Sequence, residues 1–235
     1  MRITSDEDRL VQDDDIVWYS RDKVIQSKQR YNFYITSDLT TSDSKGADFA
    51  VISVWAYTNN RDWLLVDGIC KRQLMDQSIK DLFRLVSIYH PLEVGIEING
   101  QQQGFIQWIK NEMIDKNIFF NLAGKGKTEG IRRTGSKIDA FKLVVPIIKA
   151  KKLWLPTEMK NHELVIEMLE EFRYATKAEF KSKNDDACDT VSMLLDLEAF
   201  KPSSAEVPEY TENEEGTFAY YNDDDADVYK NSTVF

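Results

Sequence analysis

The spacing of hydrophobic residues changes along the chain, and each spacing predicts one kind of element. Between residues 31 and 70 the apolar residues gather in runs rich in β-branched and aromatic side chains. Such runs predict strands at Tyr31–Asp38, Phe49–Tyr57 and Trp63–Cys70. Short polar turns separate the runs, so we expect an antiparallel meander.

Beyond residue 75 a helical spacing takes over. Apolar residues recur at intervals of three and four over Asp76–Tyr89 and Gln101–Lys116, which predicts amphipathic helices. Short apolar strands are expected at Glu93–Ile98 and Ile118–Leu122. Strands separated by helices favour parallel crossovers. The expected fold is therefore α/β, with a central mixed sheet of five or six strands, a meander followed by βαβ units, and flanking helices.

The remainder of the patterned region is mostly helical. We expect helices at Ser136–Ala150, His162–Phe172 and Asp185–Phe200, and a short extended piece at Lys152–Pro156. Arg173–Lys183 is polar and fits either a loop or a small hairpin.

Both ends of the chain lack this pattern. Residues 1–30 are polar and charged, with room for a short helix around Val24, and we expect a linker or a loosely attached arm. Residues 201–235 are acidic and rich in tyrosine, a composition that predicts a disordered tail. One domain is therefore expected over residues 31–200.

The net charge of −10 over 235 residues conceals a basic segment. Residues 123–152 carry nine Lys and Arg against Glu129 and Asp139, so a nucleic-acid partner is compatible with the sequence. The two cysteines and two histidines lack zinc-site spacing. Apolar runs fall short of the roughly 20 residues that span a bilayer. We expect a protein of a reducing compartment with no membrane partner.

Three acidic positions could act together. Asp38 ends the first predicted strand, Glu97 ends the fourth, and Asp185, Asp186 and Asp189 open the last helix. If the first and fourth strands are adjacent, their ends bring two carboxylates side by side, and the helix could add a third. Such a group repels itself unless a cation is present, and oxygen ligands select Mg²⁺ or Mn²⁺. Two such ions can stabilise a phosphodiester displacement.

Each acid also has an ordinary explanation. A carboxylate at a strand end is often simply solvated, and aspartates at a helix start stabilise its N-terminus. Glu97 is the most informative, because it lies between Ile96 and Ile98 in an apolar strand. Together, three acids on three elements predict a metal site at one edge of the sheet.

The same motifs, in this order, resemble the nuclease domain of the large terminase subunits of tailed phages, within the ribonuclease H-like superfamily. The resemblance covers about residues 31–200. Four stretches carry it: YITSDLTTSDSKGADFAVISVW, VGIEINGQQQGF, SKIDAFKLVVPIIKAKKLWLP and NDDACDTVSMLL. Each stretch is weakly specific by itself, whereas their order and spacing are specific.

The resemblance implies a hydrolase that cuts concatemeric double-stranded DNA when genome packaging begins and ends, with two Mg²⁺ or Mn²⁺ ions. By position, the family's catalytic and metal-binding triad falls on Asp38, Glu97 and Asp186. Asp48 matches an auxiliary acid of some members, and Asp185 and Asp189 flank the third position. The choice between Asp185 and Asp186 stays open.

The resemblance also implies partners: an amino-terminal ATPase domain, to which residues 1–30 would be the linker, a small terminase subunit, and a portal in the procapsid, all in the host cytoplasm. GKGKT at residues 124–128 is no P-loop, because GxxxxGK[ST] needs glycine where Asn121 stands. We expect the basic loop to contact DNA phosphates instead. The candidates are Lys125, Lys127, Arg132, Arg133 and Lys137.

Two other functions fit the sequence. The chain could be another ribonuclease H-like nuclease, such as a resolvase, which would prefer branched DNA. It could also be a catalytically silent module that docks on a portal or small subunit through its acidic tail. Binding without metal-dependent cutting would favour the second.

Overall fold

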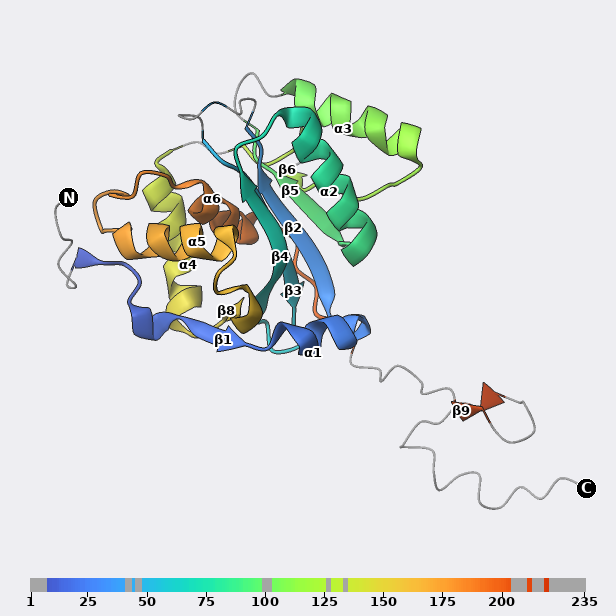
Figure 1. Cartoon of the computed structure of the whole chain (residues 1–235), viewed down its shortest axis with the longest axis horizontal. Helices are drawn as coiled ribbons and strands as arrows, with labels where there is room; N and C mark the ends of the chain where they lie inside the picture. The colour runs from blue at the N-terminus through green and yellow to red at the C-terminus, as the bar shows by residue number, and fades with distance from the viewer. Residues whose placement is uncertain are drawn as a thin grey trace, which may run out of the picture.

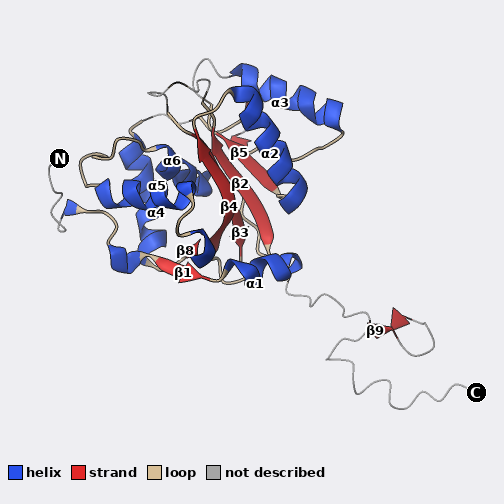
Figure 2. Ribbon diagram, viewed as in Figure 1, coloured by secondary structure: helices blue, strands red, loops and turns tan. Residues whose placement is uncertain are grey.

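A mixed six-stranded sheet with the order β1-β8-β4-β3-β2-β5 forms the centre of the molecule, and helices cover both of its faces (Figure 1, Figure 2). The computed structural model describes residues 8–40, 44, 48–98, 103–125, 128–132, 135–203, 211–212 and 218–219. The architecture confirms the expected α/β fold with its mixed sheet.

The predicted meander is present as β2 (Asn32–Asp38), β3 (Ala50–Tyr57) and β4 (Trp63–Lys71), paired antiparallel. Every residue of β3 is buried. This central strand is covered on both faces, which explains why its sequence is a continuous apolar run rather than an alternating one.

The later strands join in parallel, as the helical crossovers predicted. After α2 (Met75–Tyr89), β5 (Glu93–Ile96) pairs with β2. After α4 (Lys137–Lys149), β8 (Leu153–Pro156) pairs with β4. β5 is therefore the edge strand on one side of the sheet, next to β2 of the meander.

Two apolar cores hold the helices on the sheet. One joins α4, α5 (Glu163–Tyr174) and α6 (Asp186–Ser192) to Tyr34 and Trp55. The other lies under α2 and α3 (Gln103–Lys116) on the opposite face (Figure 1). Asp38 has the same strand parity as Tyr34, so its side chain belongs to the face that α6 covers.

The segment before residue 31 contributes to this fold, which the sequence pattern did not predict. β1 (Val17–Tyr19) pairs in parallel with β8, far away in sequence. The expected short helix is present as α1 (Arg21–Gln26), with Val24 buried. A strand of three half-buried residues has no apolar alternation by which it could be recognised.

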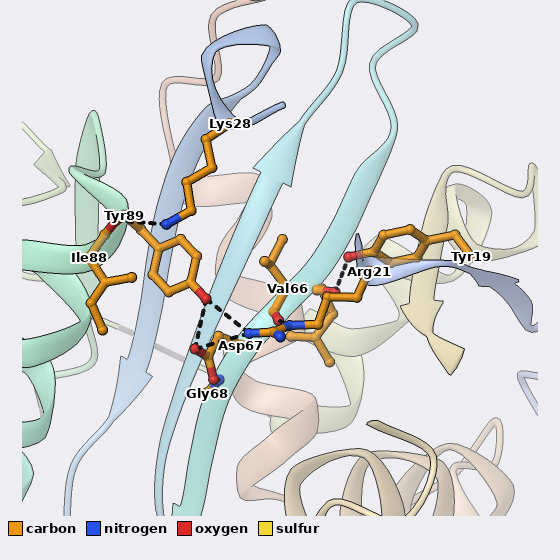
Figure 3. Close-up of polar contacts among 9 residues, drawn as sticks. Tyr19, Arg21, Lys28, Val66, Asp67, Gly68, Ile88 and Tyr89 are labelled. Atoms are coloured by element: carbon orange, nitrogen blue, oxygen red, sulfur yellow. Dashed lines mark hydrogen bonds and ion pairs between the residues drawn. The ribbon is translucent and has the colours of Figure 1, made fainter. Parts of the chain in front are cut away.

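A bulge in β4 provides the contacts that hold this segment (Figure 3). Val66 is the extra residue, because Asp67 and Leu65 face consecutive residues of β3. The Tyr19 hydroxyl donates to the Leu65 carbonyl at 2.6 Å, and the Arg21 guanidinium donates to the Val66 carbonyl. These bonds fix β1 and α1 to the centre of the sheet.

Two other predictions need correction. Residues 118–122, all described, form no strand, because only Leu122 bridges to Val94. The last helix is shorter than expected: α6 ends at Ser192, and a 3-10 helix, η5 (Met193–Asp196), follows.

Short elements complete the described chain. The other 3-10 helices of the described residues are Asp13–Asp15, Lys28–Arg30 and Thr157–Met159. Two short antiparallel pairs are β6 (Gly124–Lys125) with β7 (Thr128–Glu129) and β9 (Thr211–Glu212) with β10 (Phe218–Ala219). Most of the predicted acidic tail lies outside the described residues. Where the chain is described, no helix has the length and apolarity needed to cross a membrane.

Candidate metal centre

The first two candidate acids meet because β2 and β5 are parallel neighbours. Ser37 is paired with Ile96, and the Glu97 amide donates to the Ser37 carbonyl at 2.9 Å. The two residues that follow this pair therefore lie side by side at the same end of the two strands. Asp38 and Glu97 are those residues, as the assumed strand adjacency required.

The third carboxylate of the cluster is Asp189 of α6. Asp38, Glu97 and Asp189 each offer a carboxylate oxygen, and these oxygens all lie within 4.8 Å of one another. Asp189 is fully buried, Glu97 is buried and Asp38 is half-buried. We call these three residues the acid triad. It is built from three elements that are separate in sequence.

Asp186, which the resemblance placed in the triad, lies outside this group. Its Oδ2 accepts a hydrogen bond of 2.9 Å from the amide of Phe49, the residue directly before β3. Asp186 lies three residues before Asp189, so the two side chains project from neighbouring positions on one face of α6, and the bond to Phe49 is what distinguishes Asp186 from the triad. Asp186 is nevertheless close enough to raise the pKa of Asp38.

The acid-rich environment changes the ionisation of its members. Burial raises the pKa of Asp38 well above its usual range, and the neighbouring carboxylates of Glu97 and Asp189 raise it further. Burial also raises the pKa of Asp186 to about 6, against the lowering effect of the Phe49 hydrogen bond. A bound cation would relieve both effects, because it stabilises the ionised carboxylates.

Lys137 supplies a positive charge beside the triad. Its Nζ lies 2.6 Å from Asp189 Oδ2 and 2.7 Å from Asp185 Oδ1. Burial opposes its charge, but the attraction of Asp189 and Asp185 is stronger and raises the pKa of Lys137. It was predicted as a DNA contact, and the structure places it between two of the candidate acids. Its position on the first residue of α4 explains this reach.

The remaining predicted residues surround the site. Asp48 is exposed, directly before Phe49, and it contributes to the raised pKa of Asp186. Lys125 forms an ion pair of 3.2 Å with Asp196, and Arg132 is exposed. Lys127 and Arg133 lie outside the described residues.

A groove beside α4 brings three of the basic residues together, and one of them, Lys137, also pairs with Asp189 of the triad. It has a volume of about 220 Å³ and is lined by Lys125, Arg132 and Lys137, together with Leu143 and Leu195. Ile131 exchanges backbone hydrogen bonds with Ile96 and Ile98, on either side of Glu97. The basic loop is therefore tied to the strand that delivers one of the triad acids.

Sequence reasoning missed the residues that hold α6 in place. The Asn184 amide donates to Glu167 at 2.6 Å, and the hydroxyls of Thr190 and Ser53 lie 2.9 Å apart. Glu171 accepts hydrogen bonds from the first turn of α6. One signal was present for it, since it lies seven residues after the buried Leu164, on the apolar stripe of α5.

Comparison with known proteins supports the fold. No family model matches the chain. A curated relative, the 1,4-alpha-glucan branching enzyme GlgB of Bacillus caldolyticus, is 28% identical over 109 residues, which are 44% of this chain and 16% of that enzyme. The chain thus spans about a sixth of that relative's length. A match of this extent assigns neither a family nor an activity.

Among solved structures, the nuclease domain of the human cytomegalovirus terminase is similar, with a TM-score of 0.55, 13% identity, and coverage of 79% of this chain and 93% of that chain. The same domain soaked with Mn gives a TM-score of 0.55 at 12% identity, with the same coverage. The nuclease domain of the large terminase subunit gp2 of bacterial virus Sf6 gives 0.47 at 11% identity, covering 74% of this chain and 94% of that chain. The two cytomegalovirus comparisons confirm that this chain has the fold of that nuclease domain, the ribonuclease H-like fold expected from the sequence.

Proposed function

We propose that this protein is a metal-dependent endonuclease that hydrolyses double-stranded DNA, as the nuclease domain of a large terminase subunit. One observation carries the proposal: three carboxylates from β2, β5 and α6 converge within 4.8 Å at one edge of the sheet. The fold shared with the cytomegalovirus terminase nuclease domain supports it.

The acid triad fits a divalent metal ion. All its ligand atoms are carboxylate oxygens, the donors that Mg²⁺ and Mn²⁺ prefer. Asp38, Glu97 and Asp189 would hold an ion, and Asp186 and Asp48 are the nearby acids for a second. Bound there, the ions would activate water and stabilise the negative charge that develops on the phosphodiester.

Two features of the protein oppose metal binding at the triad: the protonation of Asp38 and the ion pairs of Lys137. The raised pKa of Asp38 means that the metal-free site holds a proton more tightly than an exposed carboxylate would. Lys137 neutralises part of the remaining charge through Asp185 and Asp189. Metal binding therefore competes with a proton at Asp38 and with the Lys137 ammonium group at Asp189.

The basic groove supplies the DNA contact of the proposal. Lys125, Arg132 and Lys137 would meet phosphates next to the triad, so affinity should fall with increasing salt. Contacts to phosphates carry no sequence information, and we expect cutting with little sequence preference.

The biological setting follows from the resemblance to large terminase subunits. The domain would cut concatemeric DNA when genome packaging begins and ends, in the host cytoplasm. Its partners would be an ATPase domain, a small terminase subunit and the portal of the procapsid.

A plasmid assay tests the proposal. The wild-type protein should nick and linearise supercoiled DNA with Mn²⁺ or Mg²⁺, and EDTA should stop it. Glu97→Gln should abolish cutting, because it removes one carboxylate of the triad. Asp115→Asn, an exposed acid of α3, is the matched control and should cut like wild type. Equal cutting by Glu97→Gln and wild type would refute the proposal, and strong preference for branched DNA would instead favour a resolvase-like enzyme.

A further inference from the structure

Glu171 is a fully buried carboxylate that the proposed chemistry does not use. It lies on α5, and its oxygens face the first turn of α6. The amide of Ala187 donates to Oε1 at 3.2 Å, and the amide of Cys188 donates to Oε2 at 2.6 Å. Burial raises the pKa of Glu171 to about 8, against the lowering effect of these hydrogen bonds. Burying a carboxylate this deeply costs free energy unless hydrogen bonds compensate for its lost hydration, as the two amides do here.

The first turn of α6 needs a cap from elsewhere. An aspartate at the N-cap normally accepts hydrogen bonds from the first helical amides. Asp185 occupies that position, but its side chain makes no such bond and instead contacts Lys137 at 2.7 Å. Asp186 accepts from Phe49. Both local acids are therefore directed away from the amides of their own helix, and Glu171 takes over the capping from α5.

We infer that Glu171 is a positioning residue, which fixes the rotation of α6 and so holds Asp189 against Asp38 and Glu97. The two capped amides belong to residues 187 and 188, directly before Asp189. The first four amides of a helix have no acceptor within it, and Glu171 satisfies two of those of α6. Losing both bonds would loosen the first turn of this seven-residue helix. The inference rests on the proposed function, since it concerns the metal affinity of the acid triad.

The test measures Mn²⁺ binding by calorimetry on the full chain, without DNA. Glu171→Gln keeps the shape of the side chain but sets an NH₂ group against one of the two backbone amides. We expect Mn²⁺ affinity to fall by about tenfold, the usual effect of losing a group that orients a metal ligand. The kcat for plasmid cutting should fall with the KM for DNA unchanged. Glu170→Gln, at the exposed neighbouring position, should bind Mn²⁺ like wild type.

A second variant separates positioning from stability. Phe172→Leu weakens the buried core of α5 and leaves the Glu171 carboxylate in place, so its melting temperature should fall by roughly 2–6 °C while Mn²⁺ affinity stays unchanged. The positioning role is overturned if Glu171→Gln binds Mn²⁺ like wild type, or if Phe172→Leu weakens binding equally. If the wild-type protein binds no Mn²⁺ and Glu97→Gln cuts DNA normally, the proposed function itself fails.

Discussion

Two clusters of charged side chains in this fold differ in how well their charges are matched: one is neutralised by its partners, and the other has an excess of negative charge. Around Asp67 each charge meets a complementary group: Oδ2 accepts from the Tyr89 hydroxyl at 2.7 Å and lies 3.5 Å from Arg21, and Oδ1 accepts from the Gly68 amide (Figure 3). At the edge of β2 and β5 the acid triad and its neighbouring aspartates gather, and Lys137 pairs with Asp185 and Asp189.

The difference separates what stabilises the fold from what could act on a substrate. In the cluster around Asp67, hydrogen bonds and opposite charges compensate for the lost hydration. This cluster therefore stabilises the packing of β1 and α1 on the sheet. A cluster with excess like charge raises the pKa of its members and costs stability in the absence of a cation. We therefore expect mutations in the two clusters to have opposite consequences.

The largest expected effect comes from Asp38→Asn. Plasmid cutting should fall at least about 100-fold, because a carboxylate ligand is lost. The same change should raise the melting temperature by roughly 2–4 °C in EDTA, since it removes like-charge repulsion from the metal-free protein. Thermal unfolding and the plasmid assay measure the two effects, and a loss of both stability and activity would contradict this account.

The stability of the acid-rich cluster should also depend on pH. Asp186 ionises near 3.8 in an unfolded chain and at about 6 in the fold. Its stabilising contribution is therefore fully present below about pH 4 and is lost as the pH rises through 6. In EDTA, Asp186→Asn should gain about 1–3 kcal/mol over wild type between pH 4 and 7. A stability difference that is constant across this range would count against the raised pKa.

In the cluster around Asp67, Arg21→Ala should have the opposite effect to Asp38→Asn: it should lower stability and leave DNA cutting normal. It removes the hydrogen bond to the Val66 carbonyl and the contacts with Asp67 and Tyr89. We expect a loss of about 2 kcal/mol, or a melting temperature lower by roughly 4–8 °C, with normal cutting at 25 °C. Lys23→Ala, at an exposed position of the same helix, is the control. Loss of cutting by folded Arg21→Ala would connect the two clusters.

The smallest effect is expected in the basic groove. Lys125→Ala and Arg132→Ala should each weaken DNA binding several-fold and lower the slope of log affinity against log salt by about 1. Lys125 should show the smaller change, because it already pairs with Asp196. Fluorescence anisotropy with Ca²⁺ in place of Mn²⁺ measures binding separately from cutting. An unchanged salt dependence in both variants would place the DNA path elsewhere.

The sequence predicted the parts of the site that depend on strand ends. Asp38 and Glu97 could be placed together because parallel neighbouring strands end at the same edge, and both strands were recognisable as apolar runs. The third acid could not be chosen in this way. Which of Asp185, Asp186 and Asp189 lies beside the two strand ends depends on the rotation of α6, and that helix contacts residues of α4, α5 and β3 that are distant in sequence.

Fold details that depend on distant partners were missed for a similar reason. β1 forms a strand because it pairs with β8, which is far away in sequence. A strand this short has no local sequence pattern from which it could be predicted. Residues 118–122 show the converse. Their propensity favours a strand. However, β5 forms only two backbone hydrogen bonds with this described segment, both at Val94: its amide donates to the Asn121 carbonyl, and its carbonyl accepts from the Ala123 amide.

The most direct test of the central claim is the anomalous diffraction of Mn²⁺ soaked into crystals of the protein. The account predicts a strong peak bound by carboxylate oxygens of Asp38, Glu97 and Asp189, with the Lys137 ammonium displaced from Asp189. The same soak of Asp38→Asn crystals should lose or weaken that peak. A fully soaked wild-type crystal with no Mn²⁺ at these three residues would contradict a metal-dependent nuclease built on the acid triad.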